Sequence, residues 1–382
     1  DYAAHGRIPM HMPGHKRNTD RFPTLSALGA GIDITEIDGF DNLHGAEGIL
    51  ADAQYRAAAL WGSDRSYFLI NGSSCGILAG IRALTRRGDA VLVSRNAHRS
   101  VYHAIELCGL RPVFLLPPLD AGTGICLSAP PEAVEAALDA HPELRLVILT
   151  SPTYEGVVSD VAAIAAAAHR HGVPLLVDEA HGAHFSLHPA FPTSAISCGA
   201  DIAVASLHKT LPSLTQTAVL HVRGPRVDAS RLAHQLAVFE TSSPSYLFLA
   251  SMDECVRALR ERPEILDAWA ARLAAFDARL APMLLHPPAV ISKDPVASDT
   301  AADHRTVTDA EVVKPMCEAI GPRLSRYRIS ECDDSAAVII RKKIYRIEKN
   351  IRSVLTEDLK RYLGSLGKLA ARVILLYVGT VV

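Results

Sequence analysis

A lysine follows a short apolar run in this sequence, and its neighbours suit it to chemistry on a carbonyl group. Residues 202–205 (IAVA) predict a buried strand, and Lys209 follows shortly after it. Ser206, His208 and Thr210 supply hydroxyl and imidazole donors for an anion. Apolar surroundings lower the pKa of an amine, and only the neutral amine attacks a carbonyl carbon. Most lysines are solvated surface residues, so this hypothesis needs partners elsewhere in the chain.

The segment 71–76 (NGSSCG) joins a predicted strand to a predicted helix and is a candidate phosphate site. Its glycines let the backbone approach a ligand, its serines donate hydrogen bonds, and a helix N-terminus attracts anions. A plain turn with a serine N-cap accounts for the same residues. Both interpretations stay open on these residues alone.

Asp178 ends another apolar run, 175–177 (LLV), where its carboxylate could bind the protonated ring nitrogen of a cofactor. A capped strand end is the alternative. His181, His184 and His188 could instead bind a metal together with Asp178. Their spacing matches no defined zinc signature, so we expect no metal site.

His98 follows the predicted strand 90–93, and we interpret it as a residue that stacks on an aromatic ring. An isolated histidine is more often a surface or core residue. A reactive amine, an anion site, a carboxylate and a stacking imidazole are together what pyridoxal 5′-phosphate requires. The working hypothesis is therefore that Lys209 forms a Schiff base with this cofactor.

The elements that position these residues alternate along the chain. Predicted strands span 67–70, 90–93, 112–116, 144–149, 174–177, 202–205 and 218–222. Predicted helices span 47–60, 76–84, 101–108, 132–138, 161–171 (with Ser159 as N-cap) and parts of 229–280. Strands that are apolar throughout predict a mainly parallel sheet covered by helices on both faces, an α/β fold. Ligands bind at the carboxyl ends of such strands, where Lys209, Asp178 and segment 71–76 lie.

The bulk composition limits the remaining possibilities. A chain of 382 residues with 49% hydrophobic content suits one large and one smaller domain. We expect an N-terminal arm with little regular structure at 1–46, a large domain at 47–285 and a small domain at 286–382, with a basic amphipathic helix at 341–363. A net charge of −2 gives no support for nucleic-acid binding, and no apolar run is long enough to span a membrane. Seven cysteines without a C-x-x-C pair favour reduced thiols and a cytoplasmic location.

With these residues in place, the chain resembles the Orn/Lys/Arg decarboxylases of pyridoxal-phosphate fold type I, the aspartate-aminotransferase fold. It is most similar to the shorter forms without an N-terminal wing domain. The resemblance covers residues 6–255 and rests on the motifs 12–16 (MPGHK), 41–44 (DNLH), 71–74 (NGSS), 151–156 (SPTYEG), 178–184 (DEAHGAH) and 206–212 (SLHKTLP). Residues from about 287 onward match the family poorly.

The resemblance implies a seven-stranded, mainly parallel sheet, a small C-terminal α+β domain and decarboxylation of lysine, arginine or ornithine. Four residues would be catalytic: Lys209, His98, Asp178 and His208. The residues expected to bind the cofactor are Ser73, Ser74, Cys75, His98, Asp178, His181, Ser206, His208, Lys209, Thr241 and Ser242. Thr241 would reach the phosphate of a neighbouring subunit, so the implied state is a homodimer, or a higher homo-oligomer, with shared active sites.

Two alternatives remain. An aminotransferase or a lyase uses the same fold and cofactor, because the fold does not fix the reaction. A truncated homologue without catalytic activity is the second. The distal charge of a basic substrate needs an acidic partner, and Glu36, Asp38, Asp41 and Glu155 are the candidates.

Overall fold

The computed structural model describes residues 10–18, 20–21, 23–120 and 125–280. The described residues up to Ala274 belong to one compact unit. The predicted C-terminal α+β domain and the predicted helix 341–363 lie outside the described residues. None of the described helices is long and apolar enough to cross a membrane.

Within the described residues, seven strands form one mixed sheet in the order β1-β7-β6-β5-β4-β2-β3. The strands are β1 (Arg65–Leu69), β2 (Ala90–Ser94), β3 (Arg111–Leu115), β4 (Leu144–Thr150), β5 (Leu175–Asp178), β6 (Ile202–Ala205) and β7 (Ala218–Val222). Strands β2 to β6 pair in parallel, whereas β7 is antiparallel to both β6 and β1. β1 therefore runs in the same direction as β6, and six strands end at the same edge. The predicted mainly parallel seven-stranded sheet is confirmed.

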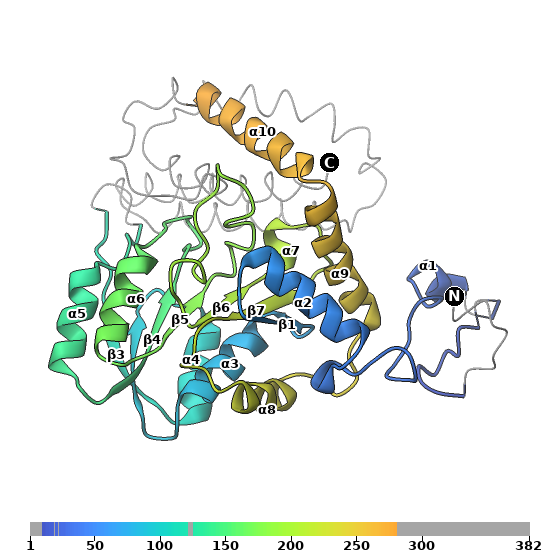
Figure 1. Ribbon diagram of the computed structural model, residues 1–382, viewed down its shortest axis with the longest axis horizontal. Helices are drawn as coiled ribbons and strands as arrows, with labels where there is room; N and C mark the ends of the chain where they lie inside the picture. Colours follow the sequence, from blue (N-terminus) through green and yellow to red (C-terminus); the bar gives the residue numbers. More distant parts are fainter. Residues whose placement is uncertain (1–9, 19, 22, 121–124, 281–382) are drawn as a thin grey trace, which may run out of the picture. The chain divides into compact units, whose positions relative to one another are not determined.

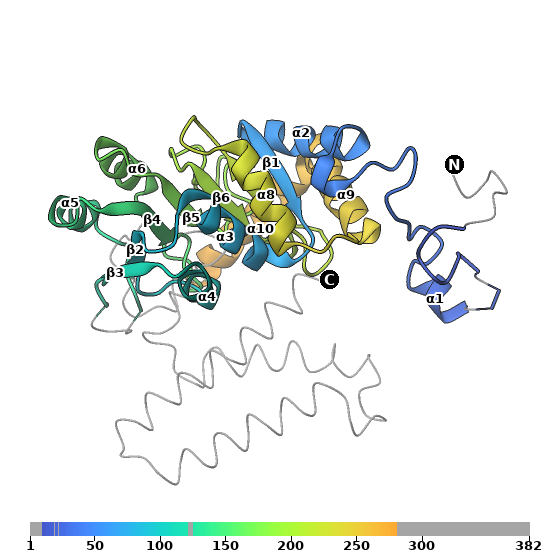
Figure 2. The same ribbon diagram turned by 90° about the horizontal axis from the view of Figure 1, so that it is seen from below.

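Helices cover both faces of this sheet, as the apolar strands predicted. The described helices are α1 (Pro23–Ala27), α2 (Ile49–Trp61), α3 (Gly72–Leu84), α4 (Arg99–Cys108), α5 (Pro131–Ala140), α6 (Val161–Arg170), α7 (Leu207–Thr210), α8 (Ala229–Phe239), α9 (Tyr246–Glu261) and α10 (Glu264–Leu280), with a 3-10 turn η2 (Leu43–Gly45). α3, α4 and α8 pack below the sheet in Figure 1, and Figure 2, seen from below, shows α3 beside α8. α5 and α6 pack on the opposite face, where α2 and α9 cover β1 and β7.

Strand β4 shows why both faces are apolar. Leu146 and Ile148 point into the core under α3 and α4, whereas Val147 and Leu149 point into the core under α5 and α6. Successive side chains of a strand alternate between faces, so a strand buried on both sides reads as a continuous apolar run. This is why the apolar run at 144–149 predicts the observed strand β4 closely.

Helix α3 lies unusually close to the sheet because it carries glycine where it crosses the strands. A Cβ added to Gly76 would lie 2.5 Å from Leu69 Cδ1 and 3.0 Å from Val204 Cγ1, closer than packed atoms approach. The close approach places the N-terminus of α3 beside the ends of β1 and β6. The first turn of this helix is therefore held against the edge where the candidate site residues lie.

Two local predictions, the start of α3 and the N-cap of α6, differ from the structure. α3 begins at Gly72 rather than at residue 76, so the serines of segment 71–76 are helical. The N-cap of α6 is Asp160, whose carboxylate accepts a hydrogen bond from Ala163 N, whereas Ser159 is buried and its N–H donates to Ser151 Oγ. The N-terminal arm contains the short α1 and η2, but none of the α1 residues is buried.

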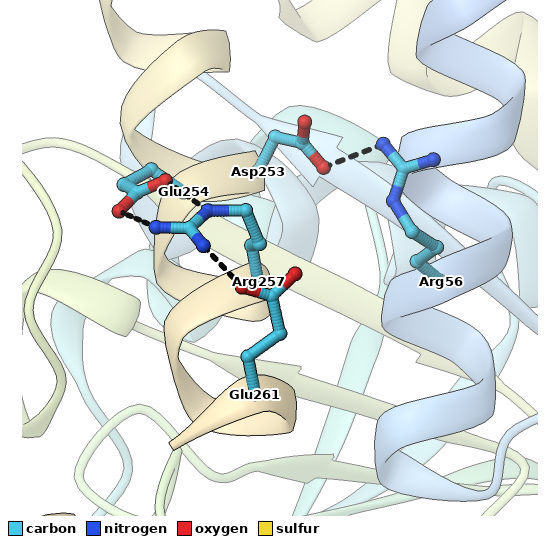
Figure 3. Close-up of polar contacts among 5 residues, drawn as sticks. All are labelled: Arg56, Asp253, Glu254, Arg257 and Glu261. Atoms are coloured by element: carbon cyan, nitrogen blue, oxygen red, sulfur yellow. Dashed lines mark hydrogen bonds and ion pairs between the residues drawn. The ribbon is translucent and has the colours of Figure 1, made fainter.

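Ion pairs on the surface join α2 to α9. Arg56 of α2 donates to Asp253 of α9 at 2.7 Å, and Arg257 lies between Glu254 and Glu261 on α9 itself (Figure 3). These side chains are substantially exposed, and ion pairs on a surface contribute little to stability because the solvent screens their charges. The buried apolar side chains between the two helices therefore contribute more of their packing.

Candidate active site

The predicted reactive lysine lies at the edge where the parallel strands end. Lys209 is in α7, the single helical turn that follows β6, and its Nζ lies 3.0 Å from His181 Nε2. Partial burial lowers the pKa of Lys209 below its usual value, and the charge of Asp178 opposes this shift. A lowered pKa increases the fraction of neutral amine, the form that attacks a carbonyl carbon.

Asp178 is the last residue of β5 and is 3% exposed. Burial raises the pKa of its carboxyl group, while the Ala180 N–H and the charges of Lys209 and His98 lower it. The N–H of Ala180 donates to Asp178 Oδ1 at 3.2 Å. Because burial outweighs these partners, the ionised carboxylate would be stabilised further by a cationic N–H. This is the property expected of a residue that binds a protonated ring nitrogen.

His181 connects Lys209 to the loop after β4. Its ring packs edge-on against Tyr154 with the ring centroids 5.6 Å apart. Burial lowers the pKa of His181 to about 3, with further lowering by Lys209, His98 and His208. The imidazole is therefore neutral near pH 7 and can accept a hydrogen bond from the Lys209 ammonium.

Three hydroxyl groups near these residues are buried and make no hydrogen bond with any residue that the structure describes. They are Thr150 Oγ1, Ser206 Oγ and Thr210 Oγ1. Thr150 pairs with Asp178 in the register of β4 and β5, and Ser206 follows β6 directly. Buried polar groups are nearly always hydrogen-bonded, so hydroxyls without protein partners at one edge fit a polar ligand. The residues present therefore fit a phosphorylated ring cofactor.

The predicted anion site lies in the first turn of α3. Ser73 and Ser74 occupy this turn, with Ser74 exposed and Ser73 half-buried. Cys75 is 3% exposed, packs in the core and donates to the Gly72 carbonyl oxygen at 3.0 Å. The predicted contribution of Cys75 to cofactor binding is thus restricted to its backbone N–H.

The turn that follows α8 lies against the start of α3 in the same chain. Thr241 N donates to Asn71 Oδ1 at 3.2 Å, and the Thr241 carbonyl oxygen lies 2.8 Å from His44 Nε2. Both Thr241 and Ser242 are exposed. The backbone of Thr241 is therefore close to the candidate anion site of its own chain.

His98 and His208 make local contacts. His98 is the N-cap of α4, where its Nδ1 accepts from Ser100 N at 3.3 Å. Partial burial lowers the pKa of His98, and the nearby Asp178 raises it. His208 Nδ1 lies 2.7 Å from the Thr217 carbonyl oxygen and donates to it, which directs Nε2 away from that carbonyl. The stacking and phosphate-binding roles of these two residues stay predictions.

The histidines of the segment 181–188 diverge instead of forming a metal site. His184 is surrounded by the rings of Phe185, Phe191 and Trp269, and His188 binds Asp267 at 3.1 Å. Within the described residues, the one group with ligand atoms close enough for a metal is Glu135, Asp139 and His171, on the outer helices α5 and α6. Among the described residues, Asp178 and these histidines do not form such a group.

Sequence reasoning missed three residues around the site, namely Glu240, Gln216 and Thr150. None of them belongs to a motif with a predicted role, although Glu240 directly precedes Thr241 and Thr150 directly follows an apolar run. Gln216 donates to the Ile70 carbonyl oxygen at 2.7 Å, and Glu240 Oε1 accepts from Ile70 N at 3.0 Å. Their role depends on contacts between distant segments, which the local pattern does not contain.

Comparisons with known proteins identify the family of this chain. A model of the family described as Orn/Lys/Arg decarboxylase, major domain, matches residues 1–269. The chain is 42% identical over 247 residues to the uncharacterized protein YaaO of Bacillus subtilis, covering 64% of this chain and 52% of that protein. It is 38% identical over 277 residues to an arginine decarboxylase of Halalkalibacterium halodurans, covering 72% of this chain and 56% of that protein. The chain spans about half the length of these curated relatives.

Solved structures support the fold. The constitutive lysine decarboxylase of Escherichia coli superposes with a TM-score of 0.66 at 21% identity, covering 77% of this chain and 46% of that chain. The sheet and its flanking helices are therefore those of pyridoxal-phosphate fold type I. Because the family model covers most of the chain, the protein is a member of the Orn/Lys/Arg decarboxylase family.

Proposed function

We propose that this protein decarboxylates a basic amino acid with pyridoxal 5′-phosphate as its cofactor, releasing CO2 and the corresponding amine. The contact between Lys209 and the neutral His181, beside the buried Asp178, is the observation that carries this proposal. Family membership supports the reaction class, and similarity to proteins named arginine decarboxylases makes arginine the first substrate to test.

Each residue of the site has a defined task in this proposal. The cofactor, when bound, supplies an aldehyde that links to amines and an electron-withdrawing ring. Lys209 supplies the amine that links it, and His181 orients that amine by accepting its hydrogen bond. Asp178 holds the proton on the ring nitrogen, which keeps the ring electron-withdrawing. Lys209 or His98 then returns a proton to the substrate carbon.

The phosphate group would be bound by hydroxyl and N–H donors. The donors proposed for it are Ser73, Ser74, Ser206, His208, Thr241 and Ser242. Of these, the Ser206 hydroxyl is fully buried and has no hydrogen-bond partner within the described part of the chain. A phosphate oxygen would supply the missing acceptor, which supports this part of the proposal.

Asp41 is not available to bind the distal charge of the substrate. Its carboxylate accepts hydrogen bonds from the backbone N–H groups of Asn42, Glu47, Gly48 and Leu50 at the start of α2. Burial raises the pKa of this carboxyl group, but those hydrogen bonds together outweigh it and lower the pKa to about 2.

The acidic partner is therefore proposed to be Glu36, Asp38 or Glu155. Glu155 follows Tyr154 directly in the chain, and the ring of Tyr154 contacts His181. That places Glu155 next to the residue that borders Lys209. Charge-assisted hydrogen bonds to a guanidinium or ammonium group are the strongest contacts that a carboxylate can make with such a substrate.

The substrate prediction is tested with the full-length protein, pyridoxal 5′-phosphate and arginine, lysine or ornithine in separate reactions. We expect stoichiometric CO2 and amine from at least one of the three, because the site combines a reactive lysine with nearby carboxylates. Acidic and aromatic amino acids serve as matched controls and should give neither product. Decarboxylation of a control alone, or formation of a keto acid in place of CO2, contradicts the proposal and favours the transaminase alternative.

We also propose that the protein is a homodimer whose active sites are shared. The Thr241 side chain is exposed, and its Oγ1 accepts a hydrogen bond from Ser243 N at 3.2 Å, so the hydroxyl can still donate its own hydrogen to a neighbouring subunit. We expect Thr241→Ala to weaken cofactor binding, because an exposed donor to an anion is lost.

Mixing Thr241→Ala subunits with Lys209→Ala subunits tests this sharing. If Thr241 acts on the partner's site, one site of each heterodimer regains both residues, and activity returns to at most about half of wild type per exchanged dimer. Subunit exchange is monitored with differently tagged chains. Complete exchange without recovered activity contradicts the shared site and indicates that Thr241 acts within its own chain.

A further inference from the structure

Glu240 is a buried carboxyl group that the proposed reaction does not use. It is the C-cap of α8 and is 8% exposed. Its Oε1 accepts from Ile70 N at 3.0 Å, directly after β1, and from Cys75 Sγ, in the first turn of α3, at 3.7 Å. One carboxyl group therefore joins the end of α8 to both sides of the turn that begins α3.

The next residue extends this connection. Thr241 N donates to Asn71 Oδ1, and Gln216 Nε2 donates to the Ile70 carbonyl oxygen. The turn between β1 and α3 is thus held by the segment 240–241 on one side and by the segment before β7 on the other. A change in the charge or geometry of Glu240 acts directly on the backbone that leads to Ser73 and Ser74.

Two titratable groups face Glu240 within the described residues. They are His44, from η2, and Cys75, from α3. Burial raises the pKa of Glu240 to about 7, and the N–H groups of Ile70 and Asn71, the charge of His44 and the thiol of Cys75 lower it. Burial also raises the pKa of Cys75, so the thiol stays protonated and donates to Glu240. Glu240 therefore changes charge near neutral pH, whereas Cys75 does not.

An anion at the first turn of α3 would compete with an ionised Glu240 for the same positive helix end. Glu240 binds the N–H groups of Ile70 and Asn71, directly before this turn, and like charges held close together in a partly buried site raise each other's proton affinity. A neutral Glu240 keeps its acceptor oxygen for Ile70 N and removes the repulsion. Protonation of Glu240 therefore keeps its hydrogen bond from Ile70 N but removes its negative charge.

We propose that Glu240 is a positioning residue for the phosphate-binding turn and that it takes up a proton when an anion binds at the start of α3. The inference rests on the cofactor site proposed above and adds that binding of the phosphate is coupled to the uptake of one proton. Deprotonation of Glu240 would then weaken phosphate binding while the β1–α3 turn keeps its conformation.

The test measures binding of pyridoxine 5′-phosphate, which lacks the aldehyde and cannot link to Lys209. Calorimetric titrations of the full-length protein compare wild type with Glu240→Gln, which keeps the acceptor oxygen but carries no charge. Between about pH 7 and about pH 8 we expect the wild-type Kd to rise by up to ~10-fold relative to the Kd of Glu240→Gln, the limit for one coupled proton. His44→Gln removes the other titratable neighbour and should keep a rise of Kd with pH, moved to higher pH because the charge of His44 no longer lowers the pKa of Glu240.

The same titrations in two buffers of different ionisation enthalpy count the protons taken up. Inorganic sulfate is the second probe, because it stays a dianion in this pH range and brings no proton of its own. We expect proton uptake with sulfate in wild type and His44→Gln, and its loss in Glu240→Gln. If Glu240→Gln does not fold, the sulfate titration of His44→Gln becomes the deciding measurement. The absence of proton uptake in that titration overturns the proposal.

Equal pH dependence in wild type and Glu240→Gln overturns the role of Glu240 and leaves the cofactor site intact. Failure of pyridoxine 5′-phosphate to bind the wild-type protein at any pH overturns the cofactor site and this inference together. The two failures are therefore distinguishable. A purely structural role for Glu240 would lower affinity equally at every pH, which also contradicts the proposal.

Discussion

The Lys209→Ala variant is expected to lose decarboxylase activity by on the order of 10³-fold or more, the largest effect of any single substitution in this protein. The variant lacks both the amine that links the cofactor and a group that can return a proton to the substrate. The measurement is the kcat for CO2 release at saturating substrate and saturating cofactor. Saturation ensures that a weaker cofactor Kd does not account for the loss.

Lys209→Arg is the matched control for this variant. It keeps a positive charge beside Asp178 and His181, but its guanidinium is not deprotonated in proteins and does not attack a carbonyl. We expect it to be as inactive as Lys209→Ala, with circular dichroism and melting temperature close to wild type. Near wild-type activity in either variant contradicts the assignment of Lys209 as the reactive amine.

Replacing Asp178 is expected to give the second largest effect, a loss of roughly 10²-fold or more in kcat for Asp178→Ala. The substitution removes the carboxylate that holds the proton on the cofactor ring, so charge that develops during decarboxylation is less stabilised. Asp178→Asn is the closer match in shape and should lose activity to a similar extent. Activity near wild type in both variants contradicts the role of Asp178.

The stability of these variants should change in the opposite direction. Burial raises the pKa of Asp178 in the folded protein, so the folded state binds its proton more tightly than the unfolded state does. This acidic group therefore destabilises the cofactor-free protein as the pH rises above its unfolded pKa. We expect cofactor-free Asp178→Asn to melt at or above the wild-type temperature near pH 7, which separates a functional loss from a folding defect.

The strands could be predicted closely because their residues are buried on both faces. β6 and β7 have the same limits in the sequence prediction and in the structure, since every residue of each is buried. The start of α3 could not be predicted as well, because Gly72 and Ser73 are typical of turns. Ser159 and Asp160 are both good N-caps, and only the hydrogen bond from Ala163 decides between them.

The residues of the candidate site also differ in how well they could be predicted from the sequence. Lys209 and Asp178 could be found from sequence because each follows a buried apolar run at the end of a parallel strand. Glu240 could not, because a glutamate at the end of an amphipathic helix is normally exposed, and its burial depends on β1 and α3. The contact of His181 with Lys209 likewise joins two loops that are distant in the chain.

Reduction of the cofactor-loaded protein with borohydride, followed by peptide mapping, tests the central claim most directly. Borohydride makes a lysine–cofactor linkage permanent, so mass spectrometry locates the pyridoxyl group on one peptide. The account predicts the label on Lys209, at one pyridoxyl group per chain, with loss of the label in Lys209→Ala. A label on another lysine, or no label with excess cofactor, would contradict it.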